Sequence, residues 1–382
     1  MSAKPAGHYT DEHEALRRSV AGFVARHITP HINEWEEAAE FPRELYTEAA
    51  QLGILGLGLP EAYGGEPGDG FHRIVVTEEL AKAGSGGIVA GLMSHAIALP
   101  PIAALGSEAL KQRVIPKVIS GEKVAALAIT EPSGGSDVAN IQTSARRDGD
   151  HYVVSGQKTF ITSGMRADFI TTAVRTGGEG LGGVSLLVID GDTPGLSRTP
   201  LKKMGWWCSD TATLFFDECR VPVSNLVGVE NQGFVGIMNN FNGERLSIAA
   251  MAWAFSKVCL HEATEYARQR NTFGRPLLRR QVIRHKLVDM ATRIGAIGAW
   301  LEKLSHMVDG GAWPIADVCM LKNAATQCFE YCAKEAVQIF GGSGCMRATT
   351  VERLYRETKI LSIGGGAEEI MKELAAKQMH LG

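Results

Sequence analysis

The spacing of apolar residues changes twice along this 382-residue chain, and these two changes constrain the fold more than any other feature. Residues 10–121 repeat apolar side chains with the 3.6-residue period of amphipathic helices. From residue 124 to about residue 217 the period is two, in short β-rich runs separated by turn residues. The helical period then returns after residue 233 and continues to the end. This order predicts an α+β, multidomain protein with domains at 1–122, 123–228 and 229–382.

The runs themselves define the expected elements. In the first domain, helices are predicted from Thr10, which is a suitable N-cap, to Pro30, and at 41–52, 71–83, 88–105 and 107–119. In the second, strands are predicted at 124–130, 142–147, 152–155, 158–162, 169–175, 184–190 and 212–217. These strands are too closely spaced for helical crossovers, so they favour an antiparallel sandwich or barrel. In the third, helices at 234–270, 280–308, 317–340 and 367–379 predict a four-helix bundle.

Composition excludes several classes of protein. A net charge of −3 provides no basic field for a nucleic acid, and no apolar run reaches the roughly 18 residues of a membrane span. Seven cysteines without CxxC spacing indicate neither a disulfide framework nor a metal site, and they fit a reducing compartment. The N-terminal segment lacks the apolar stretch of a signal peptide. These features predict a cytoplasmic protein.

A carboxylate interrupts the apolar stripe of the helix predicted at 234–270. Glu244 lies within this stripe, three residues after Phe241 and four before Ile248. Two explanations remain open from this helix alone. An ion pair with the neighbouring Arg245, or with an arginine near the helix end, would neutralise the charge. Alternatively, burial raises the pKa of the carboxyl and produces a base that works near neutral pH.

Three other stretches have a composition that packing does not explain. The stretch 130–138, TEPSGGSDV, offers hydroxyl and backbone N–H groups that can surround a pyrophosphate, or it is an ordinary turn. In KTFITSG, Phe160 and Thr162 share one side of a strand, which suits the edge of a planar ring or a plain cross-strand pair. In ILSIGGGAEEI, three glycines before the last helix permit a tight turn or close approach to a ligand.

Six segments, taken together and in order, resemble the flavin-dependent acyl-CoA dehydrogenases across essentially the whole chain. They are TEPSGGSDV, GQKTFITSG, MGWWCSDTATLFFDECRVP, EYARQRNTFGRPL, AVQIFGGSG and IGGGAEEIM. The resemblance implies that family's fold, with a helical, a β and a second helical domain, and FAD bound in the cleft. It also implies a homotetramer, a dimer of dimers, in which a neighbouring chain completes each flavin site.

The resemblance assigns roles to individual residues. Thr130 and Ser136 are expected at the flavin and its phosphates, Ser136 also at the substrate, and Thr162 is expected to donate a hydrogen bond toward the reactive ring nitrogen. Phe160 stands where many relatives carry Trp and keeps an aromatic wall. The remaining cofactor positions are Ala367 and Glu369, and, from the neighbouring chain at the adenosine end, Arg270, Thr272, Phe273, Gln338, Gly341 and Gly342. No metal is expected.

The catalytic base is where this sequence departs from many relatives. Short- and medium-chain members carry a catalytic Glu in the loop before the last helix, and that position is Gly365 here. Long-chain and isovaleryl-type members place the base on the long helix before an Arg-Leu pair, which Glu244-Arg245-Leu246 resembles. By this resemblance Glu244 is the base, and the N–H of Gly365, with a ribityl hydroxyl, stabilises the developing enolate oxygen. Arg245, Gly364 and Gly365 are expected at the substrate.

The expected reaction is α,β-dehydrogenation of an acyl-CoA thioester to the trans-2-enoyl-CoA in fatty acid β-oxidation, with electrons passed to electron-transfer flavoprotein. Gly364 replaces a Tyr of straight-chain enzymes, which favours medium-to-long or 3-methyl-branched substrates. Two alternatives remain. An acyl-CoA oxidase would reoxidise its flavin rapidly in air. A non-catalytic flavin- or CoA-binding paralogue would not be bleached by any acyl-CoA.

Overall fold

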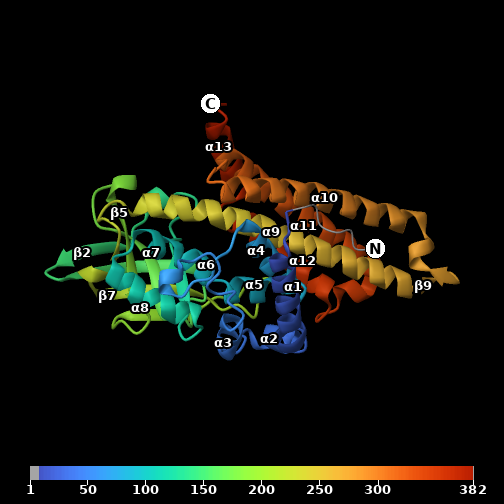
Figure 1. Cartoon of the computed structure of the whole chain (residues 1–382), viewed down its shortest axis with the longest axis horizontal. Helices are drawn as coiled ribbons and strands as arrows, with labels where there is room; N and C mark the ends of the chain where they lie inside the picture. The colour runs from blue at the N-terminus through green and yellow to red at the C-terminus, as the bar shows by residue number, and fades with distance from the viewer. Residues whose placement is uncertain (1–7, 382) are drawn as a thin grey trace.

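A computed structural model of the chain describes residues 8–381, apart from the side chain of Asn239, and it follows the predicted order of helices, sheet and helices (Figure 1). The N-terminal helices are α1 (Asp11–Phe23), α2 (Ile32–Ala38), α3 (Glu44–Ala50), α4 (Gly70–Ala81), α5 (Gly86–Leu92), α6 (His95–Ala98), α7 (Pro100–Leu105) and α8 (Glu108–Ile119). Thr10 caps α1 as predicted, because its hydroxyl accepts a hydrogen bond from the backbone N–H of His13. A π-helical turn, Val24–Ile28, extends α1.

The single helix predicted at 88–105 is wrong, because the structure has three short helices there. Ser94 lies at the first break and donates a hydrogen bond from its Oγ to the carbonyl of Ala125 at 3.0 Å, which ties the chain to the sheet. At the second break Pro100 opens α7, where its missing N–H costs nothing. The helix α2 was not predicted; it follows Pro30, where the first predicted helix was placed to end.

The middle domain is an eight-stranded sheet with the order β6-β7-β3-β2-β4-β5-β8, with β1 paired to β4. Its strands are β1 (Ala125–Ala128), β2 (Ser144–Asp148), β3 (His151–Thr162), β4 (Phe169–Arg175), β5 (Val184–Asp190), β6 (Leu196–Pro200), β7 (Thr211–Pro222) and β8 (Leu226–Val227). Most pairs are antiparallel as predicted, whereas β1 runs parallel to β4. The prediction missed β6 and β8 and divided β3 into two strands.

Strands β4 and β5 connect the sheet to the helices because they are buried on both faces. Alternate residues such as Leu186 and Val188 join a core with Leu99, Ile102 and other residues of the helical layer. The residues between them, Leu187 and Ile189 among others, belong to the core inside the curled sheet. Side chains that alternate across a strand therefore serve two cores at once.

The C-terminal helices are α9 (Gly233–Gln269), α10 (Gln281–Asp309), α11 (Ile315–Phe340), α12 (Thr350–Ile363) and α13 (Glu368–Gln378). The helix α9 has 37 residues, hence a length of about 55 Å, and runs from the sheet to the hairpin of β9 (Asn271–Thr272) and β10 (Arg275–Pro276), as Figure 1 shows. The prediction missed α12. Figure 1 also shows α13 projecting from the body.

A buried carboxyl group joins the three domains. Glu357 of α12 accepts hydrogen bonds from the N–H of Gly86 at 2.8 Å and from the N–H of Trp206 at 3.1 Å. Its side chain is fully buried, and desolvation together with the nearby Glu36 raises the pKa of Glu357. The first turn of α5 and the loop before β7 are thereby held to the C-terminal bundle.

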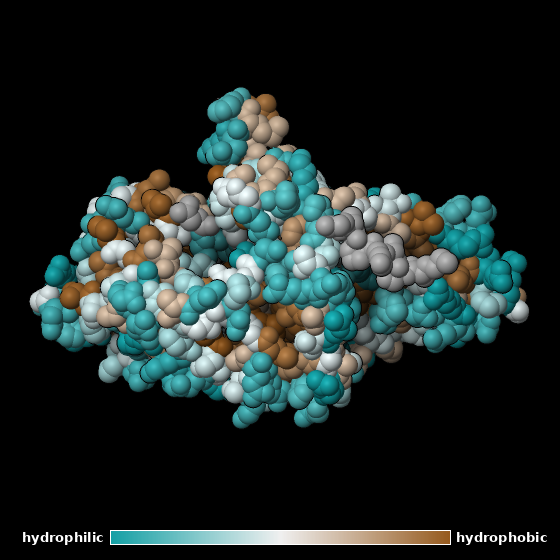
Figure 2. All heavy atoms as spheres, viewed as in Figure 1, coloured by the Kyte–Doolittle hydropathy of each residue, from teal (hydrophilic) through white to brown (hydrophobic). Residues whose placement is uncertain are grey.

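A helix that crosses a membrane has to be both long and apolar. Within residues 8–381, no single helix is long and apolar enough to cross a membrane. The helix α5 and the segment His95–Leu105, which are bent by 46° relative to each other, reach that length and apolar character only when they are taken together. Figure 2 shows apolar side chains gathered near the middle of the visible face and also in its upper left part, with mainly hydrophilic residues at the right end.

The junction at Gly86 provides a test of this packing. A Cβ at this position would lie 2.1 Å from Nε1 of Trp206, so Gly86→Ala forces a rigid indole to move. We expect the free energy of unfolding to fall by about 1–3 kcal/mol, measured by chemical denaturation. In Gly182→Ala, where no atom lies within 4 Å of the added Cβ, we expect a change of at most about 0.5 kcal/mol. Equal stability of the two variants would contradict this packing.

Candidate active site

Glu244 lies on α9 with its carboxyl group directed at the glycine loop between α12 and α13. Its Oε1 is 3.8 Å from the position that a Cβ on Gly365 would occupy. Among the residues that the structure describes, the carboxyl of Glu244 forms no hydrogen bond, and Arg245 and Lys322 act on it only through their charges. The ion pair considered for Glu244 from the sequence is therefore not present. Although the side chain is partly exposed, desolvation raises the pKa of Glu244 to about 7.

The loop opposite Glu244 depends on its glycines. Gly365 has φ +65° and Gly366 has φ +116°, which side-chain-bearing residues rarely adopt. Gly364 ends α12, where its N–H bonds to the carbonyl of Ile360 at 2.8 Å. The N–H of Gly365 has no acceptor among residues 8–381. The arrangement therefore presents a carboxyl group and a backbone donor together.

Two cations hold this loop from the protein side. Arg245 is buried, and its Nε donates to the carbonyl of Gly365 at 3.3 Å, while its Nη1 donates to Asn242 at 3.1 Å. Lys322 of α11 donates from Nζ to the carbonyls of Ser362 and Gly366, each at 2.8 Å. Arg245 thus contacts the loop, not the carboxyl group of Glu244.

The predicted loop 130–138 is held to the sheet by a buried ion pair between Glu131 in the loop and Lys158 of β3. Oε1 of Glu131 lies 2.8 Å from Nζ of Lys158 and also accepts from the N–H of Thr143 at 2.9 Å. Lys158 has no exposed surface, and it also donates to the carbonyl of Ile129 at 2.9 Å. This anchoring leaves Ser136 exposed and Thr130 half-buried at the end of β1.

Phe160 and Thr162 lie beside this loop near the end of β3. The pairing of β3 with β7 shifts register between Lys158 and Ile161, and Phe160 at this bulge has φ +60°. The Phe160 side chain is 69% exposed, whereas Ile161 is buried and Thr162 is half-buried. The bulge thus turns a large aromatic side chain outward, which is consistent with the predicted aromatic wall.

Four of the residues predicted at the adenosine end line one cavity of about 390 Å³, namely Arg270, Thr272, Gly341 and Gly342. They come from the end of α9, from β9 and from the turn after α11. The Oγ1 of Thr272 is buried and has no hydrogen-bond partner among the described residues. Beside the cavity, Phe273 is 96% exposed. A cationic side chain and an orphaned hydroxyl indicate a polar, anionic ligand.

The remaining predicted residues lie at the edges of these groups. Gln338 is exposed in the last turn of α11, Ala367 is the N-cap of α13, and Glu369 is exposed in the first turn of α13. Figure 1 shows β9 at the opposite end of the long axis from β2 and β7. A single chain therefore does not bring the loop 130–138 and the hairpin cavity together.

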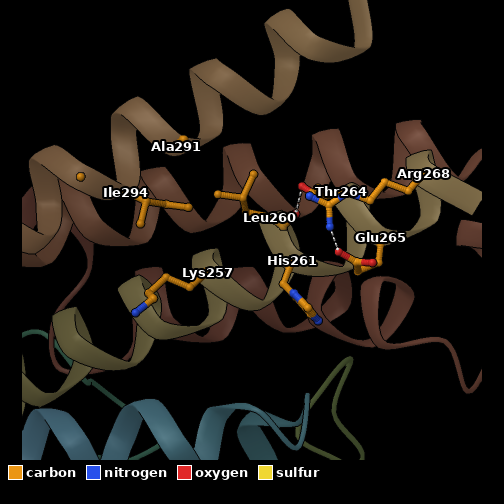
Figure 3. Close-up of a pocket in the computed structure, with 9 residues that line it drawn as sticks. Lys257, Leu260, His261, Thr264, Glu265, Arg268, Ala291 and Ile294 are labelled. Carbon is orange, nitrogen blue, oxygen red and sulfur yellow. Dashed lines mark hydrogen bonds and ion pairs between the residues drawn. The ribbon is translucent and has the colours of Figure 1, made fainter. Parts of the chain in front are cut away.

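A further cavity of about 430 Å³ lies between α9 and α10 (Figure 3). The polar contacts drawn there stay within α9: Thr264 donates to the carbonyl of Leu260 at 2.7 Å, and Arg268 pairs with Glu265. None of the predicted residues lines this cavity. It offers no converging set of reactive groups.

Lys322 and the Glu131–Lys158 pair were not predicted. Lys322 interrupts the apolar stripe that includes Val318, Ala325 and Phe329. This is the same signal that identified Glu244, and it was available in the sequence. Glu131 and Lys158, by contrast, are distant in sequence, and only the folded sheet brings them together, so no local pattern indicates the pair.

Comparison with known proteins identifies the family and the fold. The N-terminal, middle and C-terminal domains of acyl-CoA dehydrogenases match residues 10–122, 126–219 and 231–380. The chain is 37% identical to acyl-CoA dehydrogenase AFT10-1 of Alternaria alternata, over 97% of this chain and 92% of that protein. It is 34% identical to the mitochondrial long-chain specific acyl-CoA dehydrogenase of Sus scrofa, over 97% and 87%. A crystal structure of a probable acyl-CoA dehydrogenase from Mycobacterium abscessus has a TM-score of 0.95 and 50% identity, covering 97% and 99%. The predicted family and fold are confirmed.

The position of Glu244 predicts an unusual titration. Because desolvation disfavours the charged form, its pKa lies above the ordinary value, and we expect half-ionisation near pH 7. Infrared difference spectra of protein labelled with ¹³C-glutamate should show a carboxylate band growing between about pH 6 and 8, which Glu244→Gln removes. A band already complete at pH 6 would show that the carboxyl is not desolvated.

Proposed function

Because this chain belongs to the acyl-CoA dehydrogenase family, we propose that it converts an acyl-CoA thioester to the trans-2-enoyl-CoA with Glu244 as the base. The observation that carries this proposal is the position of the Glu244 carboxyl, unpaired and desolvated, opposite the glycine loop. Relatives with their base in that loop would place it at position 365. A Cβ at position 365 would lie 3.8 Å from Oε1 of Glu244, so the two positions border the same space. In this chain Cδ1 of Ile248, 2.5 Å from that Cβ, occupies the room that a side chain at 365 needs.

The chain's own groups account for the proton transfer. Ionised Glu244 removes the α-proton of the thioester, and the electron pair of the C–H bond moves into the new Cα–Cβ double bond. A pKa of about 7 lets Glu244 be ionised yet basic enough at neutral pH. The free N–H of Gly365 donates to the thioester oxygen, where negative charge develops.

FAD is the cofactor of this family, and the residues present fit it. When bound, it supplies the acceptor for the hydride that leaves Cβ. The exposed Phe160, with Thr162, Thr130 and Ser136, offers an aromatic face edged by donors. The unpartnered hydroxyl of Thr272 and the guanidinium of Arg270 suit the phosphate and adenosine end. Ala367 and Glu369 complete the proposed cofactor contacts.

The proposed site needs two chains, because the adenosine-end residues lie at the β9 hairpin, at one end of the long axis and away from the sheet that carries the flavin-end residues (Figure 1). A homotetramer built as a dimer of dimers satisfies this requirement. We propose electron-transfer flavoprotein as the electron acceptor, which is the partner of this family. The seven cysteines are all free, which supports a reducing compartment such as the cytoplasm.

The substrate is proposed to be a medium-to-long or 3-methyl-branched acyl-CoA. Neither Gly364 nor Gly365 carries a side chain, so space beside the thioester carbonyl remains for a branch. The likeness to a long-chain specific enzyme supports the same choice. Ser136 and Arg245 are the other residues proposed near the substrate, Arg245 by holding the loop.

An oxidase on this fold, or a non-catalytic paralogue, remains an alternative outcome of the tests. Reduced flavin that is reoxidised rapidly in air would favour the oxidase. Flavin that no acyl-CoA bleaches under anaerobic conditions would favour the paralogue. The desolvated carboxyl of Glu244 argues against the paralogue because a binding protein has no need of it.

Replacement of the base tests the reaction. In Glu244→Gln we expect anaerobic flavin reduction by a good acyl-CoA to slow by about 10²- to 10⁴-fold, with flavin content unchanged, because the amide cannot accept the proton. In the wild type kcat/KM should fall as pH drops below about 7, since protonated Glu244 is inactive. Glu262→Gln, on the same helix, is the matched control. Wild-type reduction by Glu244→Gln would exclude Glu244 as the base.

A panel of thioesters tests the substrate. We expect isovaleryl-CoA, octanoyl-CoA or a longer thioester to exceed butyryl-CoA in kcat/KM by about tenfold or more, since each buried methylene contributes roughly 1–3 kcal/mol. Gly364 has φ −60°, which any residue adopts, and an added Cβ would lie 3.1 Å from the carbonyl oxygen of Ile360, so a side chain needs a small backbone shift. Gly364→Tyr should reduce kcat/KM for branched thioesters more than for butyryl-CoA. A wild-type preference for butyryl-CoA would contradict the proposed substrate class.

A further inference from the structure

Lys322 is a fully buried cation without a carboxylate partner within 4.0 Å in the described part of the chain. A buried charge is costly unless polar groups replace its hydration. Its Nζ meets that need with two carbonyls, those of Ser362 and Gly366, each at 2.8 Å. Ser362 lies in the last turn of α12, where the helix dipole favours a cation. Lys322 therefore forms hydrogen bonds to both ends of the segment that contains Gly364 and Gly365.

The glycine loop cannot fix its own conformation. Gly365 and Gly366 occupy a backbone region that glycine enters freely and also leaves freely. Apart from the bond of the Gly364 N–H to Ile360, the tethers seen within residues 8–381 are the carbonyl contacts of Lys322 and Arg245. Arg245 holds the carbonyl of Gly365 from α9, and Lys322 holds the flanking carbonyls from α11. The direction of the Gly365 N–H is thus set by two side chains outside the loop.

Lys322 also acts on Glu244 through charge. The groups facing it are Glu244 and Arg245 from α9, Glu368 from α13, and Cys319 on its own helix. Burial lowers the pKa of Lys322 to about 8, so it is largely protonated at pH 7. The charges of Arg245 and Lys322 both lower the pKa of Glu244, against the larger effect of desolvation. Loss of either cation would leave Glu244 protonated at a higher pH.

We propose that Lys322 is a positioning residue for the reaction: by binding the carbonyls of Ser362 and Gly366 it fixes the Gly365 N–H at the thioester oxygen, and its charge acts on Glu244, although it touches no reacting atom. This inference rests on the proposed function of Glu244 and Gly365. It adds a residue to the site that neither ligand contact nor reactivity would identify.

Lys322→Met tests both roles, because it keeps most of the unbranched side chain and removes the charged Nζ with its donors. We expect flavin reduction at saturating acyl-CoA to slow by about 10- to 100-fold with KM changed much less, since the loop acts on the transition state. The acidic limb of the pH profile of flavin reduction should move to higher pH, because Glu244 loses a neighbouring positive charge. Hydrogen exchange of the peptide spanning residues 362–368 should accelerate, a readout that does not depend on turnover.

Companion variants separate the two roles. Lys322→Arg keeps the charge and should keep the acidic limb at its wild-type pH. Lys322→Gln keeps an amide donor without the charge, so the acidic limb of the pH profile should move to higher pH. This variant replaces Lys322→Met if the Met variant does not fold. The matched control is Lys334→Ala, which removes an exposed lysine from the same helix; the Nζ of Lys334 lies 4.0 Å from Oε1 of Glu335, away from the loop. It should match the wild type in rate, pH profile and exchange.

The proposal is wrong if folded Lys322→Met or Lys322→Gln matches the wild type in rate, pH profile and exchange of the loop. It is also wrong if the rate falls while exchange and the acidic limb stay fixed, because the loss would then be unrelated to the loop. These results differ from failure of the proposed function, which is judged from Glu244→Gln. Slow reduction by Glu244→Gln with normal Lys322 variants would leave Glu244 as the base and reject only the role of Lys322.

Discussion

The desolvation of one carboxyl group beneath a glycine loop is the constraint on which the site depends. A carboxylate in the apolar stripe of α9 is unfavourable for folding alone, since no partner within the described residues neutralises it. Its pKa of about 7 is the consequence, and that value suits a base at neutral pH. Gly365 packs closely against α9 at this point, because a Cβ there would lie 2.5 Å from Cδ1 of Ile248 and 3.8 Å from Oε1 of Glu244.

Buried ionisable side chains in this protein repeatedly hold backbone where regular structure ends. Glu131 with Lys158 anchors the loop after β1, Glu357 binds two N–H groups at the junction of the domains, and Lys322 binds two carbonyls beside Glu244. A glycine-rich loop has few side chains with which to pack. An ionised or hydrogen-bonding side chain reaching from a neighbouring rigid element therefore replaces packing, and the cost of its burial is offset by several hydrogen bonds to the backbone.

Much of the architecture was predictable because it depends on local periodicity. The predicted strands 169–175 and 184–190 match β4 and β5 residue for residue, and α9, α10 and α11 end within two residues of their predicted bounds. The errors occur where local signals are weak. The strand β6 carries the polar sequence LSRTP and pairs only along β7, and α12 lies between two glycine-rich turns in a stretch of mixed polarity. The interruption of 88–105 depends on contacts of Ser94 with the sheet.

The sequence by itself determined the class of fold and the family. It also indicated Glu244 as the proposed base, because a carboxylate in an apolar stripe and the glycine at 365 are both visible in the sequence. The tertiary structure decided what these residues do for each other. It removed the proposed ion pair of Glu244, turned Arg245 toward the loop and brought Lys322 of α11 to the same carbonyls. Burial and charge at one point are sums over several helices, so they depend on how α9, α11 and α12 pack, and no single segment contains that information.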